Sequence, residues 1–477
     1  MVADTDTGNV VRVGSASSGG LDKFFKISER GSTPRVEIVA GVTTWLTMAY
    51  ILVVNPAILS TLPDSTGQSL PFDQLVAVTA LAAGVLCLAM GIFTNYPFAM
   101  AAGLGLNAFV AFTLVGAAGL TWEQAMGVIV IEGLVIAALV LTGLRELVMN
   151  AIPMDLKRAI GIGIGLFIAF IGLVETGIVI HPEAGVPIVT LNADLTTLPI
   201  LTFVIGLAIT ATLVARKIKG GLLIGIIATT VVASIINAIA DTAVFPPGVA
   251  EWPDKIADVP DLSLIGNFSF DVFSGETIAF ATALALIISV MLSDFFDTMG
   301  TVIGVGGEAG LLTKEGKLPG IKRVLLVDSL GAALGGATSS SSNTTYIESA
   351  AGVSDGGRTG LTAVTVGVLF LLAMFLAPLP GVVPTQATAP VLVIVGYFMM
   401  SVVREIDWKD AGIGIPILLT MIVMPFTFSI TNGVGAGFVS NTVIQVLRGK
   451  WSEVHWLLYV VSAIFVWYFV EGLVPLS

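Results

Sequence analysis

The sequence contains few of the residues that a soluble protein places on its surface. Only 11% of its 477 residues are charged and 55% are hydrophobic, whereas about 25% of the residues of an average soluble domain are charged. A chain of this length would need many surface charges if it folded into water-soluble domains. The shortage of charge therefore excludes a soluble globular protein and favours a chain that lies mostly in lipid.

Cysteine and histidine are also scarce. The single Cys87 lies in an apolar run and has no second cysteine to pair with, which excludes disulfides and cysteine-built metal or redox sites. With only His181 and His455, a histidine-built metal site is not expected either. There is no basic patch to bind phosphate, so we expect no nucleic-acid partner. We also expect no cofactor and no metal.

Long uncharged runs dominate what is present. Residues 74–122, 359–403 and 411–447 contain no Asp, Glu, Lys or Arg, and each run exceeds the roughly 20 residues that one membrane helix needs. These runs exclude an outer-membrane barrel and predict membrane hairpins. Hydropathy, Pro, Gly and charge divide the chain into fourteen segments near 36–59, 74–93, 97–117, 121–143, 156–175, 197–215, 220–240, 277–303, 320–337, 338–356, 359–379, 387–403, 411–429 and 430–447.

Basic residues test this segmentation, because Lys and Arg concentrate on cytoplasmic loops. If the N-terminal segment is cytoplasmic, the later basic clusters also fall inside, and the mostly acidic loop 241–276 falls outside. The clusters are Lys23, Lys26, Arg30 and Arg35; Arg145, Lys157 and Arg158; Arg216, Lys217 and Lys219; Lys314, Lys317, Lys322 and Arg323; Arg358; Arg404 and Lys409; and Arg448 and Lys450. The sequence therefore predicts a multi-pass protein of the plasma (inner) membrane with a cytoplasmic N-terminus.

The two ends of the chain differ from the rest. Residues 1–34 are polar and rich in Ser and Gly, so we expect a disordered cytosolic tail and no cleavable signal peptide. Residues 455–473 are apolar and long enough to span again, although Trp456 and Tyr459 also suit the lipid headgroup zone. We expect a C-terminal membrane or interfacial helix within 449–477, with an additional membrane helix as the preferred reading.

The two sets of seven segments have a weak internal similarity. Residues 152–170 resemble 383–400 in their pattern of Pro followed by apolar residues, and 219–236 resemble 431–447. A repeat with an odd number of spans must be inverted in the membrane. Inverted repeats are typical of secondary transporters whose sites lie near the bilayer midplane, although channels contain them too.

Two segments, each the third of its set, do not have a helical pattern. Residues 94–107 place Pro97, Gly103 and Gly105 among small residues, and 335–346 is a run of Ser and Thr. Non-helical backbone is tolerated at membrane depth only where it is buried in protein or lines a cavity. We expect two short extended pieces that pair with each other, each followed by a half-helix whose N-terminus faces the site. An ordinary cytoplasmic loop at 335–346 is the alternative, but it would break the charge alternation.

Ionisable residues inside the predicted spans are few, and such residues are functional candidates by default. Asp294 and Asp297 are three residues apart and so share a helix face. Two neighbouring carboxylates favour protonation of one of them, which suits a proton carrier. Glu348 follows the polar run where a half-helix would begin, and Asn107 lies at the matching junction.

Each of these residues also has a structural reading. Asp297 could cap a helix or bond to the hydroxyls of 338–345, and Glu348 and Asn107 could cap backbone. Glu132 and Glu175 are expected to lack polar company, and Asp328 is expected to bond to nearby backbone or hydroxyls. A structural role is the preferred reading for Glu132, Glu175 and Asp328.

Several long motifs resemble one family of transporters. GLGLNAFVAF at 103–112, SDFFDTMGTVIGVGGEAGLL at 293–312 and SSSNTTYIESAAGVSDGGRTGLTAV at 340–364 are similar to the AzgA-like adenine, guanine and hypoxanthine permeases of the nucleobase–cation symporter-2 (xanthine/uracil permease) superfamily. RVEIVAGVTTWLTMAYILVVNPAIL at 35–59 fits as well. The resemblance runs from about residue 21 to the C-terminus.

The resemblance implies an all-α polytopic fold of fourteen segments in a 7+7 inverted repeat with two short extended strands at midplane. It implies a core (transport) domain at 35–143 and 277–379, a gate (scaffold) domain at 144–240 and 380–448, an elevator mechanism and a homodimer. It places purine binding at Asn107, Asp294 and Glu348, with Asp297 as a coupling residue and Asp328 matching an aspartate that related permeases use. Phe295, Phe296 and Tyr346 are candidates for the aromatic residue that stacks on the base, and Phe296 and Tyr346 are preferred.

The chemistry of these residues agrees with a purine cargo. A carboxylate and an amide can pair with the N–H and acceptor groups of a neutral base, and an aromatic ring can lie against it. With histidine scarce, H+ would have to be carried by a carboxylate, and H+ is preferred to Na+ as the coupling ion.

Three other functions remain open. An anion exchanger could use the same architecture, because bicarbonate and sulfate exchangers resemble it, but would want a basic residue in the core spans. A passive channel would need a continuous polar stripe along several spans. An intramembrane enzyme would need a nucleophile with a base, and Ser340 to Ser342 have no histidine near in sequence.

Overall fold

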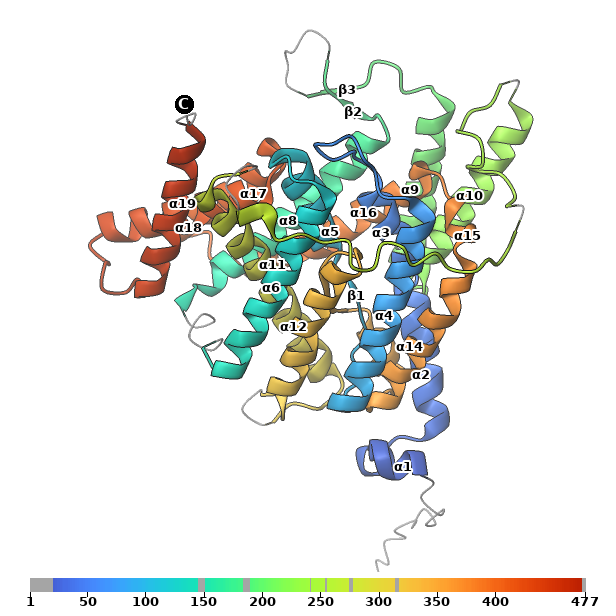
Figure 1. Ribbon diagram of the computed structural model, residues 1–477, viewed down its shortest axis with the longest axis horizontal. Coiled ribbons are helices and arrows are strands. Elements are labelled where there is room, and N and C mark those ends of the chain that lie inside the picture. The colour runs from blue at the N-terminus through green and yellow to red at the C-terminus, as the bar shows by residue number, and fades with distance from the viewer. Residues whose placement is uncertain are drawn as a thin grey trace, which may run out of the picture.

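The computed structural model describes residues 20–144, 151–182, 189–240, 242–253, 255–273, 278–313 and 317–473. The chain is almost entirely helical, with two pairs of very short strands (Figure 1). A helix lies within each of the fourteen predicted segments. The predicted all-α multi-pass class is therefore confirmed.

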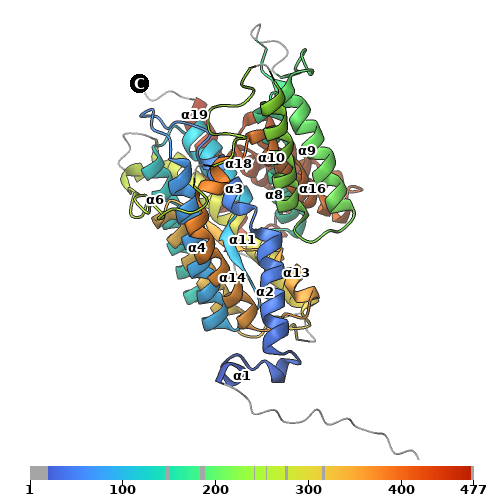
Figure 2. The same ribbon diagram turned by 90° about the vertical axis from the view of Figure 1, so that its right-hand side faces the viewer.

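The helices form two groups, which Figure 2 shows on opposite sides of the molecule. In the first group α4 packs on α14, α6 packs on α12 and α11, and α2 packs on α13 and α14. Its elements are α2 (Pro34–Met48), α3 (Ile51–Leu59), α4 (Phe72–Thr94), α5 (Leu104–Ala108), the π-helical η2 (Phe109–Ala117), α6 (Trp122–Thr142), α11 (Phe280–Glu308), α12 (Ile321–Ala337), α13 (Ser349–Ser354) and α14 (Gly360–Ala373).

In the second group α8 packs on α16 and α17, α9 packs on α10 and α16, and α17 packs on α18. Its helices are α8 (Met154–Glu175), α9 (Leu198–Ala215), α10 (Gly221–Ile239), α16 (Thr385–Met400), α17 (Ala411–Thr427) and α18 (Ile430–Leu447). The remaining short elements are α1 (Gly20–Phe25), η1 (Ser28–Arg30), β2 (Val179–Ile180), β3 (Thr190–Leu191), η3 (Asp271–Phe273), η4 (Met374–Leu376), α15 (Pro378–Gly381) and η5 (Ser401–Glu405).

Local sequence signals set where the long helices begin and end. Thr33 caps α2 by accepting from the Val36 backbone N–H, with Pro34 at the first helical position. Thr121 and Gln124 form a reciprocal capping box at the start of α6. Helix α4 ends at Asn95, which has a left-handed φ of 57°. These caps satisfy backbone groups that lipid could not.

The two non-helical segments pair with each other as predicted. Strand β1 (Met100–Ala102) runs antiparallel to β4 (Asn343–Thr345), with Ala101 opposite Thr344. The predicted bounds of the second segment were too early, because helix α12 continues to Ala337 and the non-helical stretch begins only at Thr338. Gly335 and Gly336 therefore belong to the last turn of a helix.

The N-terminal region differs in part from the expected disordered tail. Residues 1–19 lie outside the described residues, but from Gly20 the chain forms α1. Phe25 and Ile27 are buried against Leu361 at the start of α14, and Asn95 donates to the Phe25 carbonyl oxygen at 2.8 Å. Apolar contacts thus hold residues 20–33 against the first group of helices, although their sequence is mostly polar.

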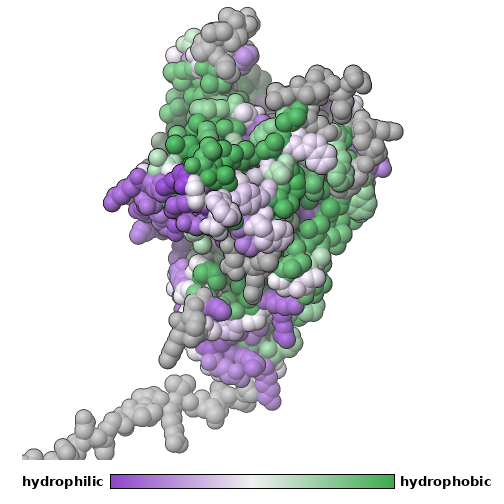
Figure 3. Space-filling view, turned by 90° about the vertical axis from the view of Figure 1, so that its left-hand side faces the viewer, coloured by the Kyte–Doolittle hydropathy of each residue, from purple (hydrophilic) through white to green (hydrophobic). Residues whose placement is uncertain are grey.

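The surface and the helix lengths fit a membrane protein. Within the described residues, eight helices are long and apolar enough to cross a membrane. Hydrophobic residues cover much of the face in Figure 3, and hydrophilic residues gather in one patch at its left edge and in another toward its lower end. The C-terminal helix predicted at 455–473 is present as α19 (Trp456–Leu473), which packs on α18 and α11. Arg145, Asp241, Asp254, Glu276 and Lys314 lie outside the described residues.

Candidate binding site

The site is built around the point where β1 and β4 cross between helices. The Gly103 backbone N–H donates to the Ser342 carbonyl oxygen at 3.0 Å, and the Tyr346 N–H donates to the Ala99 carbonyl at 2.9 Å. The Ala99 N–H in turn donates to the Ser349 hydroxyl at 2.9 Å. Backbone groups that no helix satisfies are therefore satisfied by the opposite segment, as burial in a membrane requires.

The chain leading into β4 is strained. Ser339 and Ser341 have φ angles of 56° and 70°, a left-handed conformation that costs a non-glycine residue of order 1–3 kcal/mol. Side-chain bonds hold this conformation, because Asn343 Nδ2 donates to the Ser340 hydroxyl at 2.9 Å and Ser339 Oγ donates to the Leu264 carbonyl at 3.0 Å. Such strain typically persists at functional sites.

Asp328 on α12 fastens β4 to the neighbouring helices. Its Oδ2 accepts from the Thr298 hydroxyl of α11 at 2.6 Å, and its Oδ1 accepts from the Thr345 backbone N–H at 3.0 Å. Thr298 also lies 2.8 Å from the Thr344 hydroxyl. The sequence-based expectation that Asp328 bonds to nearby backbone and hydroxyls is confirmed.

Asp294 lies at the centre of α11 and is completely buried. No N–H or O–H group among the described residues donates to either of its oxygens. The group within hydrogen-bonding reach is instead another carboxyl, Glu132 of α6, whose Oε2 accepts from Ser342 at 3.4 Å. The expectation that Glu132 lacks polar company was wrong, because α6 and α11 bring together residues far apart in the chain.

Asp297 and Glu348 lie one helical turn farther along the same surface. Glu348 is the N-cap residue of α13, and its Oε1 accepts from the Tyr50 hydroxyl at 2.6 Å. Tyr50 stands in the break between α2 and α3, a position that no sequence signal had marked. Asp297 is exposed on α11, near enough to Glu348 and Asp328 to interact with both electrostatically.

Asn107 occupies the corresponding place after β1. It lies within α5, one turn after the N-cap residue Gly103, and its backbone N–H bonds to the Gly103 carbonyl at 2.8 Å. Both polar atoms of its buried side chain lack a hydrogen-bond partner among the described residues. Since buried amides are normally bonded, Asn107 is available to a ligand, and its side chain caps no backbone group.

The three candidate aromatic residues have different surroundings. Phe295 is buried against Ile136, Val140 and Leu325 in the core. The Tyr346 hydroxyl donates to the Ala102 carbonyl and so holds β1. Phe296 is partly buried, and Lys157 of α8 lies over its ring at 5.5 Å. Of the three, Phe296 is therefore the one that contacts the other helix group.

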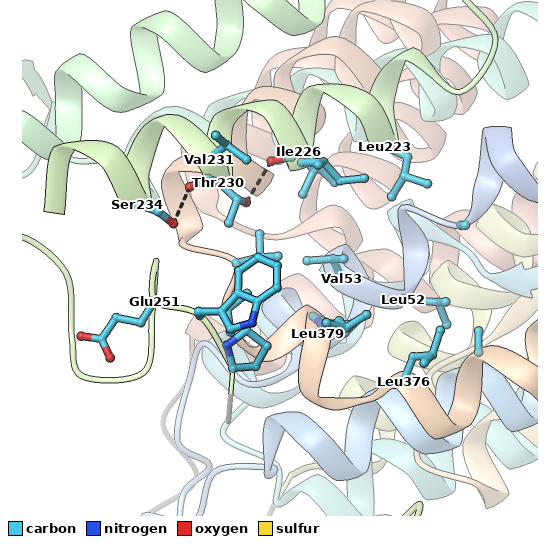
Figure 4. A pocket seen from close by; sticks show the side chains of 18 of the residues that line it. Leu52, Val53, Leu223, Ile226, Thr230, Val231, Ser234, Glu251, Leu376 and Leu379 are labelled. Atoms are coloured by element: carbon cyan, nitrogen blue, oxygen red, sulfur yellow. Dashed lines mark hydrogen bonds between the residues drawn. The ribbon is translucent and has the colours of Figure 1, made fainter. Parts of the chain in front are cut away.

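A well-formed apolar pocket lies away from this polar cluster, between α2 and α3 of the first group and α10 of the second (Figure 4). It has a volume of about 360 Å³. Its wall includes Thr230 and Ser234, but both hydroxyls bond back to carbonyls of α10 at 2.9 Å and 3.0 Å. A ligand with polar edges would find few partners there, so the carboxylate cluster is the better candidate site.

Among the residues that the structure describes, one ion pair joins the two helix groups. Lys219, between α9 and α10, bonds to Asp355, which also accepts from the Thr43 hydroxyl of α2 at 2.7 Å. The bonds from Lys219 and then from Thr43 lower the pKa of Asp355 below its usual value. A lowered carboxyl pKa keeps the pair charged at neutral pH and disrupts it only as the pH falls through that lowered value.

The site has no obvious place for a metal ion. Among the residues that the structure describes, no group of three His, Cys, Asp or Glu side chains could hold one. Glu175, the other carboxylate of a predicted span, lies apart at the end of α8 and accepts from Thr61 at 3.5 Å. The structure thus gathers Asn107, Asp294, Asp297, Asp328 and Glu348 around the β1–β4 crossing and adds Glu132 and Tyr50 to them.

Known proteins resemble this chain over most of its length. Residues 35–435 match the permease family Xan_ur_permease. The adenine permease AdeQ of Escherichia coli is 39% identical over 452 residues, which cover 94% of this chain and 96% of that protein. The guanine/hypoxanthine permease PbuG of Bacillus subtilis is 39% identical over 460 residues, which cover 94% and 99%.

A more distant likeness exists among solved structures. The transmembrane domain of a cyanobacterium bicarbonate transporter, BicA, superposes with a TM-score of 0.59 at 13% identity, covering 84% of this chain and 97% of that chain. A murine Solute Carrier 26 anion transporter in the inward-facing state gives 0.56 at 10% identity, covering 94% and 76%. At these identities the likeness establishes a shared fold alone.

Proposed function

Because the chain belongs to the xanthine/uracil permease family, we propose that it imports the purine nucleobases adenine, guanine and hypoxanthine together with protons. As a family member the protein is a membrane permease and not an enzyme. The observation that carries the proposal is the buried cluster at the β1–β4 crossing. There, no described N–H or O–H group donates to Asp294, and neither polar side-chain atom of Asn107 has a hydrogen-bond partner among the described residues. The names of the similar permeases supply the class of cargo.

The residues of the cluster match the edge of a purine. Asp294 and Glu348 accept from ring or exocyclic N–H groups, and the amide of Asn107 both donates and accepts. Phe296 provides an aromatic face for the planar base, while Tyr346 holds β1 in place through its bond to Ala102. A base lacking a required N–H would leave a buried acceptor unpaired, which makes such a site selective.

Carboxylates carry the coupling proton in this proposal. Asp294, Asp297 and Asp328 lie close together around α11 and α12, and Glu348 faces Asp297. Adding a proton removes one negative charge from a cluster that would otherwise hold several in a poorly hydrated place. The protonated cluster then moves with the purine, and release of both at the cytoplasmic side resets it.

The architecture proposed is a 7+7 inverted repeat with a core domain at 35–143 and 277–379 and a gate domain at 144–240 and 380–448. Exchanging the two sets of seven segments maps observed packing pairs onto other observed pairs: α4 with α14 onto α12 with α6, and α9 with α10 onto α17 with α18. Strands β1 and β4 map onto each other. This symmetry supports the repeat, and the two helix groups correspond to the two domains.

An elevator motion of the core past the gate, within a homodimer in the inner membrane, completes the proposal. The contacts between the groups include an aromatic cluster in which Phe112 of η2 meets Phe167 of α8 and Phe428 at 6.2 Å and 5.7 Å. Aromatic and aliphatic surfaces can slide without breaking many hydrogen bonds. The charge pattern orients the N-terminus toward the cytoplasm.

Transport assays test the substrate and the coupling ion together. Purified protein in proteoliposomes is expected to accumulate labelled adenine, guanine or hypoxanthine when an inward pH gradient is imposed, and to lose this accumulation with a protonophore. A sodium gradient at equal pH should have no effect. If sodium alone drives full accumulation, the carboxylates serve Na+ and the proton proposal is wrong.

The same assay separates the rival cargo. Labelled bicarbonate is included in the panel because the structural neighbours include a bicarbonate transporter. We expect no bicarbonate uptake, since the side chains named at the β1–β4 crossing are carboxylates, amides, hydroxyls and aromatics that would repel an anion or bind it weakly. Uptake of bicarbonate without purine would overturn the proposed cargo.

Cross-linking tests the elevator. Cysteines placed at Lys219 and Asp355 and joined by a short bifunctional reagent should reduce purine uptake at least about tenfold, because the link ties one helix group to the other. Native Cys87 is buried and gives little background. As a control, the Asp410 and Arg448 positions, an ion pair within the second group, are linked in the same way. Equal activity of the two linked proteins would argue against relative motion.

A further inference from the structure

The carboxyl that approaches Asp294 most directly is Glu132, and it was not among the residues expected to act in transport. Both side chains are completely buried. They lie within hydrogen-bonding reach of one another, although Glu132 Oε1 and both oxygens of Asp294 lack any N–H or O–H donor among the described residues. Two ionised carboxylates in this position would repel each other with no compensating donor.

A single proton resolves this arrangement. It would form an O–H···O bond between the two carboxyls, satisfy one otherwise unpaired oxygen on each side and leave a single negative charge on the pair. Ser342, in the strained segment before β4, donates to Glu132 Oε2 at 3.4 Å and so favours ionised Glu132. The site therefore contains a donor that can help Glu132 release its proton.

We propose that Glu132 and Asp294 form the binding site of the transported proton, and that Glu132 holds the proton while Asp294 accepts a purine N–H. The proposal rests on the proposed proton-coupled purine transport and specifies its proton site. When purine enters, the proton shared by the pair moves to Glu132, and the oxygen of Asp294 that it leaves accepts the base. No bond other than these O–H bonds changes.

The elements that pack on α6 differ in the charged groups that they bring near Glu132. Helix α11 contributes Asp294, and one turn farther Asp297, which is exposed. Helix α12 contributes Asp328, which already accepts from Thr298 and the Thr345 N–H. Of the other elements on α6, η2 contains no titratable residue, and Asp271 of η3 is exposed. The pair of Glu132 and Asp294 is therefore a more buried place for a shared proton than the pair expected from sequence spacing, Asp294 and Asp297.

The test is Glu132→Gln in proteoliposomes. The new amide donates to Asp294 without a transferable proton, so labelled purine should still exchange at equal pH within about threefold of the parent. Accumulation driven by a pH gradient should fall by at least about tenfold, the equivalent of one pH unit of coupling. The dependence of exchange on pH should flatten, a change that a purely structural role would not produce. Glu175→Gln, the same chemical change away from the cluster, should behave as the parent.

A second variant keeps the test valid if Glu132→Gln does not fold. Ser342→Ala leaves both carboxyls but removes the donor that favours ionised Glu132, so the pH profile of exchange should move to higher pH. Parent-like accumulation and an unchanged pH profile in Glu132→Gln, or an unchanged profile in Ser342→Ala, would overturn this proton site while leaving proton symport in place. A parent protein that fails to accumulate purine with a pH gradient would instead overturn the transport proposal itself.

Discussion

Replacing Asp294 by asparagine or Glu348 by glutamine is expected to abolish purine accumulation in proteoliposomes while leaving the protein folded in the membrane. Each change preserves side-chain size but removes one anionic acceptor from a buried site. Hydrogen bonds to charged groups contribute about 1.5–3 kcal/mol, so binding of labelled purine should weaken by roughly 10- to 100-fold. Asp294→Asn also removes a proton carrier, so its accumulation should fall to background even at saturating purine.

The matched control is Asp407→Asn, because Asp407 is an exposed loop carboxylate that, among the described residues, accepts only from the Lys409 backbone N–H at 3.1 Å. It should transport as the parent does. Glu348→Gln keeps an acceptor for the Tyr50 hydroxyl, so a loss of function there reflects the lost charge. Near-normal accumulation by either site variant, at equal amounts of monodisperse protein, would remove that residue from the proposed site.

Gly335→Ala should be a strongly damaging substitution, although it adds only one methyl group. A Cβ at this position would lie 1.9 Å from the Ser341 carbonyl oxygen and 2.3 Å from Asn343 Nδ2. The backbone before β4 would have to move, and this segment is already strained at Ser339 and Ser341. Overpacking of a tight interior costs about 1–3 kcal/mol and sometimes more, so the detergent melting temperature should fall and purine binding should be lost.

Gly161→Ala provides the comparison for this result. Gly161 lies in α8 with no atom within 4 Å of the added Cβ, and alanine is favoured over glycine in a helix by about 1 kcal/mol. Its melting temperature should be unchanged or higher, with parent-like binding. If Gly335→Ala melts and binds as Gly161→Ala does, then the close approach of α12 to the polar segment is not required for the site.

Much of the fold was predictable because a segment that lies in lipid must be apolar and must satisfy its backbone hydrogen bonds. Spans such as 74–93 and 197–215 correspond closely to α4 (Phe72–Thr94) and α9 (Leu198–Ala215), since a membrane helix needs a sustained apolar run. The breaks predicted at 94–107 and 335–346 were visible as Pro, Gly, Ser and Thr within such runs. Their mutual pairing followed because unsatisfied backbone is not tolerated in lipid. The ordered segment after Gly20 was missed because its few apolar anchors lie in a polar stretch.

The candidate site was predictable only in part. Asp294, Asp297 and Glu348 were evident because ionisable residues are rare in apolar segments and because long motifs resembled a family. Glu132 is also an ionisable residue in an apolar segment, but it lies outside the motifs and a structural role was preferred for it. Tyr50 lies in the motif at 35–59, where nothing distinguished it from its neighbours. Glu132 is flanked by apolar residues, and its neighbours Asp294 and Ser342 are more than 150 residues away in the chain. Tyr50 meets Glu348 only because α2 packs on α13.

Composition, hydropathy and the Pro, Gly and polar residues that interrupt the apolar runs were enough to establish a multi-pass helical protein with two broken segments and buried carboxylates. These properties depend on local transfer of each residue between water and lipid, which does not require knowing its neighbours in space. Which carboxyl faces which, and which polar atoms keep no partner, depended on how α6, α11 and α12 pack around β4. Hydrogen bonds and charge interactions act over a few ångströms, so only the folded chain could bring Glu132 to Asp294 and occupy Asp328 with Thr298 and Thr345.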